Sequence, residues 1–159
     1  MNGTGRKGIS WGSVALGWAV AVFAGAVISP ILRVLYGLVS EPPVERGEFT
    51  AAVVVIAVIS GFLGYLIGGY LAARLAGYSG GLNGAMTAVF GMVLGVILAV
   101  ILAVFGLIFV EGVAMPPANF GLAGEALLAG LILFLVNLFG GFVGGKLGEP
   151  SRPDVWRVD

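Results

Sequence analysis

The sequence contains no cysteine and no histidine, and each absence removes a class of chemistry. Without thiols there are no disulfides and no thiolate metal sites, and cysteine usage says nothing about the redox compartment. Without imidazole there is no histidine general base, and no haem or chlorophyll can be held through that ring. We therefore expect no cofactor and no metal site.

Charged residues are also scarce, at 10% of the chain against about 25% in soluble domains. Hydrophobic residues make up 59%, and the mean hydropathy is +1.09. A surface of this composition could not be kept in water, so the chain belongs in a lipid bilayer. The formal net charge is zero, which argues against nucleic acid as a partner.

Long apolar runs fill most of the 159 residues, and a spanning helix needs roughly 20. The runs cover residues 11–29 with an extension past Pro30 to 39, then 50–73, 84–110 and 122–147. We predict an all-α, polytopic domain of four transmembrane helices within 1–159, with a short tail at 148–159. Arg6, Lys7 and "AGA" at 24–26 also fit a cleavable signal peptide, but the apolar run continues beyond them, which favours a retained helix.

Basic residues in the connections predict the orientation. If the N-terminus is cytoplasmic, the cytoplasmic face holds six of them: Arg6, Lys7, Arg74, Lys146, Arg152 and Arg157. The outer face then holds two, Arg33 and Arg46, and most of the acids. We predict a multi-pass protein of a prokaryotic cytoplasmic membrane with both termini cytoplasmic, Arg74 and Lys146 anchoring two helix ends, and Arg33 at the outer headgroups.

An internal repeat connects the two halves of the chain. A shift of 72 residues places Gly68 on Gly140 and Arg74 on Lys146, so that "GGYLAARLAG" matches "GGFVGGKLGE". The same shift places Gly12 on Gly84, and the loops "EPPV" and "MPPA" match near that register. We interpret this pattern as two parallel-repeated helical hairpins, which makes the second and fourth helices parallel.

Small residues recur four apart in three of the predicted helices, which places them on one face of each helix. They are Gly64, Gly68, Ala72 and Ala76 in the second, Gly91 and Gly95 in the third, and Gly140, Gly144 and Gly148 in the fourth. Faces without side chains allow two helix backbones to approach closely. A thin-walled pore is the alternative, and helix packing is the favoured interpretation because glycine is common in spanning helices.

Polar side chains inside the spans are few, and none is ionisable at membrane depth. Asn137 is a side-chain amide well inside a span, and the repeat pairs it with Tyr65. With Ser60 and Thr87 these residues could line a polar path, although hydrogen bonding between helices is the favoured role. No nucleophile with a base and no pair of carboxylates can be assembled, so we expect no enzyme.

The phrase "GGYLAARLAGYSGGLNGAM" resembles a motif in a loose group of uncharacterised four-span prokaryotic membrane proteins. The residues that carry the motif are Gly68, Gly69, Ala73, Arg74, Gly80, Gly81, Asn83, Gly84 and Ala85. The group often has Gly and His where this chain has Ala73 and Asn83. The resemblance implies four spans and a membrane location. The function of the group is not established.

The sequence favours a non-enzymatic protein that acts through helix packing, either by self-association or as an accessory subunit of a larger membrane complex. The alternative is a small channel or facilitator for a neutral or anionic solute. "VNLFGGFVGG" is similar to the Asn-x-x-Gly segment of small four-helix fluoride channels, but no matching polar helix break follows. Lipid handling at the two Pro-Pro loops is a third interpretation.

Overall fold

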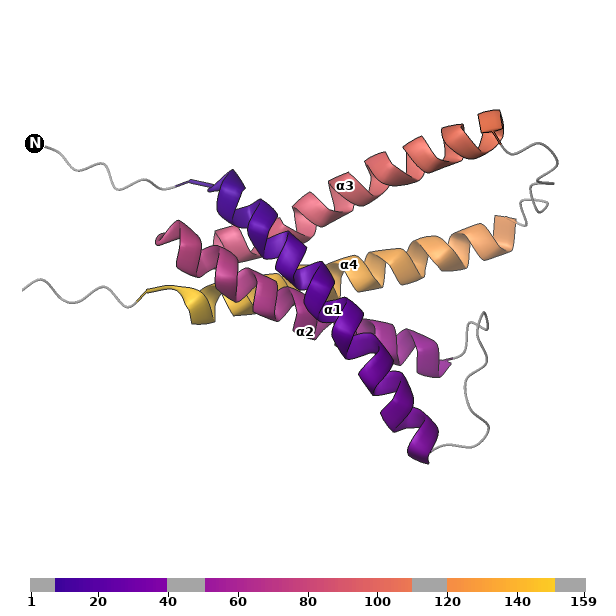
Figure 1. Ribbon diagram of the computed structural model, residues 1–159, viewed down its shortest axis with the longest axis horizontal. Helices are drawn as coiled ribbons and strands as arrows, with labels where there is room; N and C mark the ends of the chain where they lie inside the picture. Colours follow the sequence, from indigo (N-terminus) through magenta and orange to yellow (C-terminus); the bar gives the residue numbers. More distant parts are fainter. Residues whose placement is uncertain (1–7, 40–50, 110–119, 151–159) are drawn as a thin grey trace, which may run out of the picture.

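Figure 1 shows the computed structural model, which describes residues 8–39, 51–109 and 120–150. Within these residues the chain forms four helices and no strand. The helices are α1 (Trp11–Val39), α2 (Ala51–Ala76), α3 (Gly80–Phe109) and α4 (Phe120–Gly148). Each is long and apolar enough to span a membrane. The predicted all-α, four-span fold is confirmed.

A three-residue turn separates α2 from α3, and both helices extend further toward it than the hydropathy predicted. α2 continues to Ala76 instead of 73, and α3 begins at Gly80 instead of 84. Gly77 has a φ of 72°, and its N–H donates to the carbonyl of Ala73 at 3.0 Å. A residue without Cβ adopts this left-handed conformation without strain, so α2 ends here.

α1 is continuous for 29 residues and includes Pro30. Proline removes one backbone hydrogen bond within a helix, yet spanning helices tolerate it when neighbouring groups compensate. The extension past Pro30 to 39 therefore belongs to the same helix. At about 1.5 Å per residue α1 is about 43 Å long, which exceeds the roughly 30 Å hydrocarbon thickness of a bilayer.

α2 and α3 each contact the other three helices, and the most extensive interfaces are those of α2 with α1 and with α4. Among the described residues α1 and α4 do not contact each other. α2 and α4 run parallel, since Phe62, Leu66 and Tyr70 lie against Gly140, Gly144 and Gly148 in the same order. The predicted parallel arrangement of these two helices is therefore observed, while the duplication that would explain it remains a hypothesis.

The helices cross closely in one half of the molecule and diverge in the other (Figure 1). We call the end that carries Arg74 and Lys146 the basic end and the opposite end the distal end. Val14, Ala73 and Asn83, toward the basic end, are completely buried, whereas Val39 at the distal end is 90% exposed. In the most apolar window of each helix only 17% to 28% of the residues are buried. Most of each apolar window is therefore not covered by the other helices of the chain.

Several sequence predictions lie outside the described residues. The segments 1–7, 40–50, 110–119 and 151–159 hold both Pro-Pro pairs, most of the predicted tail and most of the charges that predict the orientation. Of the eight basic residues used to predict the orientation, Arg33, Arg74 and Lys146 are described.

Candidate functional site

The interface between α1 and α2 is built on small residues. If Gly64 carried a side chain, its Cβ would lie 2.6 Å from the carbonyl oxygen of Ala21, which is too close for any residue larger than glycine. A Cβ at Gly68 would overlap the carbonyl oxygen of Gly17. Ala72 is completely buried beside Gly17. The stripe predicted on α2 therefore packs against α1, in the same hairpin.

The stripe predicted on α4 packs against a different face of α2. A Cβ at Gly140 would stand 2.6 Å from the carbonyl oxygen of Phe62. At Gly144 and Gly148 it would overlap the carbonyl oxygens of Leu66 and Tyr70, one and two turns further on. The two predicted stripes thus do not meet each other, and each one presses on the backbone of a neighbouring helix.

A second set of glycines, which the sequence analysis did not single out as packing residues, brings α2, α3 and α4 together. A Cβ at Gly69 and a Cβ at Gly84 would each overlap the carbonyl oxygen of Gly141. Gly80 and Gly145 approach each other in the same way. Gly80 and Gly84, like Gly141 and Gly145, are four residues apart, so the spacing rule used for the other stripes would have found them.

The repeat does not place equivalent glycines in equivalent surroundings. Gly12 and Gly84 coincide under the shift of 72 residues, but a Cβ at Gly12 would meet no heavy atom within 4 Å. Gly84 is buried against Gly141 and Gly145. In the two hairpins the α1–α2 and α3–α4 contacts therefore have different registers.

Asn83 is the most highly connected polar residue of the described chain. It is completely buried, and its Oδ1 accepts a hydrogen bond from the Ser10 backbone N–H at 2.7 Å. Its Nδ2 lies 2.9 Å from the carbonyl of Tyr78 and 3.2 Å from that of Ser79, within donating distance of both. Asn83 thus joins the start of α1 to the turn between α2 and α3. The sequence analysis noted it only as a motif residue.

Tyr65, Trp18 and Gly91 meet where α2, α1 and α3 converge. A hydrogen bond joins the side chains of Trp18 and Tyr65. Because the indole N–H of Trp18 can only donate, the Tyr65 hydroxyl is the acceptor. A Cβ at Gly91 would stand 2.5 Å from this hydroxyl and 2.7 Å from Trp18 Nε1. Trp18 also packs edge-on against Phe90 at 5.6 Å between ring centroids. Gly91 therefore provides the space for this aromatic pair.

Ser60 and Thr87 are hydrogen-bonded within their own helices. The Ser60 hydroxyl donates to the carbonyl of Ala57 at 3.2 Å, and the Thr87 hydroxyl donates to that of Gly84 at 2.6 Å. Thr87 is completely buried between Gly17 and Gly141, on α1 and α4. Both residues act here as packing groups whose hydroxyl protons already have an acceptor.

Asn137 lies on α4 opposite Gly61 of α2. Its Oδ1 would stand 2.5 Å from a Cβ at Gly61, and this oxygen is buried without a hydrogen-bond partner. A glycine Cα–H beside a carbonyl oxygen provides a weak contact of the kind that is common between helices. The amide therefore fills the space that the missing Gly61 side chain leaves.

The four residues of the predicted polar path lie at different helix interfaces. Ser60 lies beside α1, Thr87 between α1 and α4, Tyr65 beside α1 and α3, and Asn137 against α2. Among the described residues no hydrogen bond joins any two of them.

The two predicted anchors lie at the basic end, and both are exposed. Arg74 donates from Nε to the Tyr70 hydroxyl at 3.1 Å, with its guanidinium 5.3 Å from the centre of that ring. Lys146 lies 3.7 Å from the Glu149 carboxylate. Exposed ion pairs contribute little to stability, so these contacts orient the side chains at the membrane surface.

Residues 92–101 of α3 are exposed at nearly every position. Between residues 92 and 101, Leu94 is the one position that is not exposed. No heavy atom lies within 4 Å of where a Cβ of Gly95 would stand, so of the two small residues predicted on α3 only Gly91 has a packing partner.

Within the described residues, no group of three His, Cys, Asp or Glu residues could hold a metal ion. In the comparisons with known proteins, no family model, no curated protein and no solved structure matches this chain.

Proposed function

We propose that this multi-pass membrane protein is non-enzymatic and acts by association with other transmembrane helices, as a self-associating protein or as an accessory subunit of a larger complex. The predicted location is a prokaryotic cytoplasmic membrane with both termini cytoplasmic. The observation that carries the proposal is the stretch 92–101 of α3, which is exposed at all positions but Leu94 although the basic half of the same helix is tightly packed.

The glycine stripes themselves do not provide the association surface that the sequence suggested. Gly64 and Gly68 are covered by α1, and Gly140 and Gly144 are covered by α2. A partner helix could not reach them without separating the bundle. Association therefore uses residues 92–101 of α3, where Val96 is 59% exposed.

A photo-crosslinking amino acid at Val96 tests this proposal in native membranes. We expect a covalent adduct with a second copy or with another membrane protein, because only these supply helices at this depth. The control is the same substitution at Phe139 of α4, which is 61% exposed but lies beside α2, where its ring stacks on Phe62. Lipid adducts alone at Val96, or equal protein adducts at both positions, would contradict the proposal.

A path for a small solute is the second candidate, and its support is the unpaired Oδ1 of Asn137. The backbone contacts of Gly69, Gly84 and Gly141 leave no lumen between α2, α3 and α4 at their level. We expect no fluoride or other small-anion flux in proteoliposomes of the wild type, and none in Asn137→Leu. A wild-type flux that Asn137→Leu abolishes would replace the proposed function with a channel.

A further inference from the structure

The helix termini at the basic end lie at one level. The Ser10 N–H donates to Asn83, which places the start of α1 beside the turn between α2 and α3. Gly80 and Gly145 approach each other closely, which places the end of α4 beside the start of α3. Trp11, at the start of α1, is 58% exposed, and exposed tryptophan is typical of the boundary between lipid and water. This level therefore marks the membrane surface at the basic end.

Tyr70 orients Arg74 at this level. The Nε of Arg74 donates to the Tyr70 hydroxyl at 3.1 Å, and the guanidinium carbon lies 5.3 Å from the centre of the ring. Because this hydrogen bond uses Nε, the two terminal nitrogens of the guanidinium remain for another acceptor. Among the described residues no carboxylate pairs with Arg74, whereas Lys146 lies 3.7 Å from Glu149. Arg74 is therefore an oriented, exposed cation without a counter-charge in the described part of the chain.

An apolar face of α2 continues from Arg74 into the membrane. Tyr70, Ile67 and Leu63 precede Arg74 by four, seven and eleven residues, a spacing that keeps them on one side of the helix. Their exposed fractions are 38%, 43% and 37%, so the other helices of the chain leave this side open. Eleven residues span about 16 Å along a helix, which matches the depth of one hydrocarbon leaflet, half of roughly 30 Å.

A phospholipid matches both parts of this surface. Its phosphate accepts a bidentate pair of hydrogen bonds from an arginine, and its acyl chain covers apolar side chains. A free phosphate ion would leave the apolar face uncovered, and a partner helix would remove the guanidinium from water and need an acid at that level. We infer that Arg74 and Tyr70 bind the headgroup of a phospholipid in the leaflet at the basic end, with an acyl chain along Ile67 and Leu63. An anionic lipid binds there more tightly than phosphatidylcholine, because no choline offsets the charge of its phosphate.

A photo-crosslinking amino acid at Ile67 tests this inference. The full chain is placed in nanodiscs that contain phosphatidylglycerol and phosphatidylcholine with identical acyl chains at equal mole fraction. Mass spectrometry then measures the covalent adducts of each lipid. We expect phosphatidylglycerol adducts to exceed phosphatidylcholine adducts by up to about fivefold, the factor for one cation at a bilayer surface.

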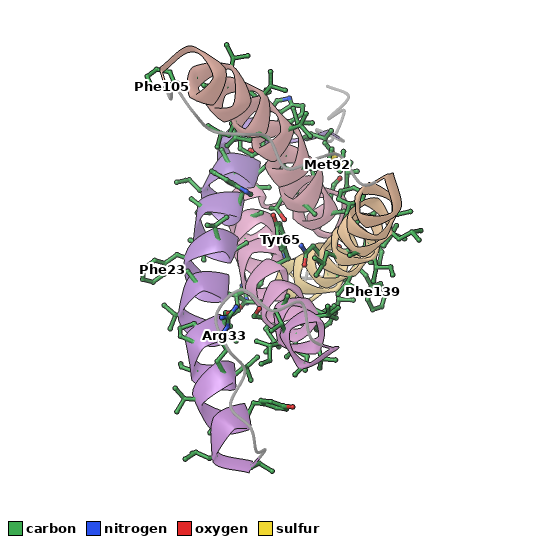
Figure 2. The ribbon with its side chains drawn as sticks, turned by 90° about the vertical axis from the view of Figure 1, so that its right-hand side faces the viewer. Phe23, Arg33, Tyr65, Met92, Phe105 and Phe139 are labelled. Carbon is green, nitrogen blue, oxygen red and sulfur yellow. The ribbon has the colours of Figure 1, made fainter. Side chains whose placement is uncertain are left out.

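The same amino acid at Phe139 of α4 is the matched control. Phe139 precedes Lys146 by seven residues, as Ile67 precedes Arg74, and it is 61% exposed at the outer edge of the bundle (Figure 2). Because Lys146 is paired with Glu149, we expect the two lipids to form nearly equal numbers of adducts there. The same preference for phosphatidylglycerol at both positions would show only a general attraction of anionic lipid to the protein and would overturn the inference.

Variants of the headgroup site complete the test. We expect Arg74→Gln to abolish the preference at Ile67 and Arg74→Lys to keep part of it, since lysine does not bind phosphate in a bidentate manner. Tyr70→Phe should reduce it, because the guanidinium loses the hydroxyl that orients it. Circular dichroism confirms that each variant retains its helices. Equal adducts of both lipids without these substitutions, or a preference that survives Arg74→Gln, would overturn the inference. Protein adducts at Ile67 in place of lipid would also overturn it, and would leave the proposed association of the protein standing.

Discussion

Gly141→Val is expected to prevent stable packing of the four helices. The new side chain would be driven into the backbone of Gly84 and against the Thr87 hydroxyl, which is 3.2 Å from the position of a Cβ. Overpacked sites ordinarily cost about 1–3 kcal/mol, and we expect at least the upper end because the obstacle is backbone, which cannot change rotamer. The measurement is the free energy of unfolding by SDS titration in mixed micelles, followed by circular dichroism.

Gly130→Val is the matched control, because it makes the same change on the same helix. No heavy atom lies within 4 Å of a Cβ at Gly130, so we expect the free energy of unfolding to stay within about 0.5 kcal/mol of the wild type. A similar loss in both variants would mean that valine disfavours α4 itself, and would contradict the close approach of α3 and α4 at Gly141.

Asn83→Leu is expected to destabilise the protein by about 2 kcal/mol or more, because polar groups lose their partners where water reaches them poorly. The Ser10 N–H loses its acceptor, and the carbonyls of Tyr78 and Ser79 lose a donor. Without the hydrogen bond to Ser10, the start of α1 should also unfold locally more often, which is measured as faster amide hydrogen exchange near Trp11.

Asn137→Leu makes the same substitution at a half-buried asparagine whose Oδ1 is buried without a partner. It should change the free energy of unfolding by less than about 1 kcal/mol, since hydrogen bonds between membrane helices average about 0.6 kcal/mol and this oxygen makes none. If Asn137→Leu proved the more destabilising of the two, Asn137 would have a partner that the contacts of α4 do not show, and the structural role assigned to Asn83 would be wrong.

The glycine contacts show why the spacing of small residues along the sequence could not predict which helices pack together. The periodicity of Gly64 and Gly68 predicted a small-residue face on α2, and that face exists. Periodicity identifies a face of one helix, but not the helix that covers it. That choice depends on the rotation of every helix about its own axis. Because α2 lies between three neighbours, its small residues divide between α1 and α4.

The different structural roles of Asn83 and Asn137 could not be predicted from periodicity either. Each is an amide within or beside an apolar run, and hydropathy treats them alike. Asn83 is 73 residues from its hydrogen-bond partner Ser10, a separation at which no local pattern operates. Asn137 is within reach of Gly61 only because α2 and α4 run side by side.

Composition and apolar run length were enough to determine that this chain is all-helical, that it spans a membrane four times, and that α1 continues through Pro30. These properties depend on the free energy of transferring each helix into lipid, and that free energy is a sum over the residues of the helix itself. Only the tertiary structure decided that the glycines join the helices within one chain and that the basic halves pack while the distal halves diverge. Those features depend on backbone distances between helices, which no single helix encodes by itself.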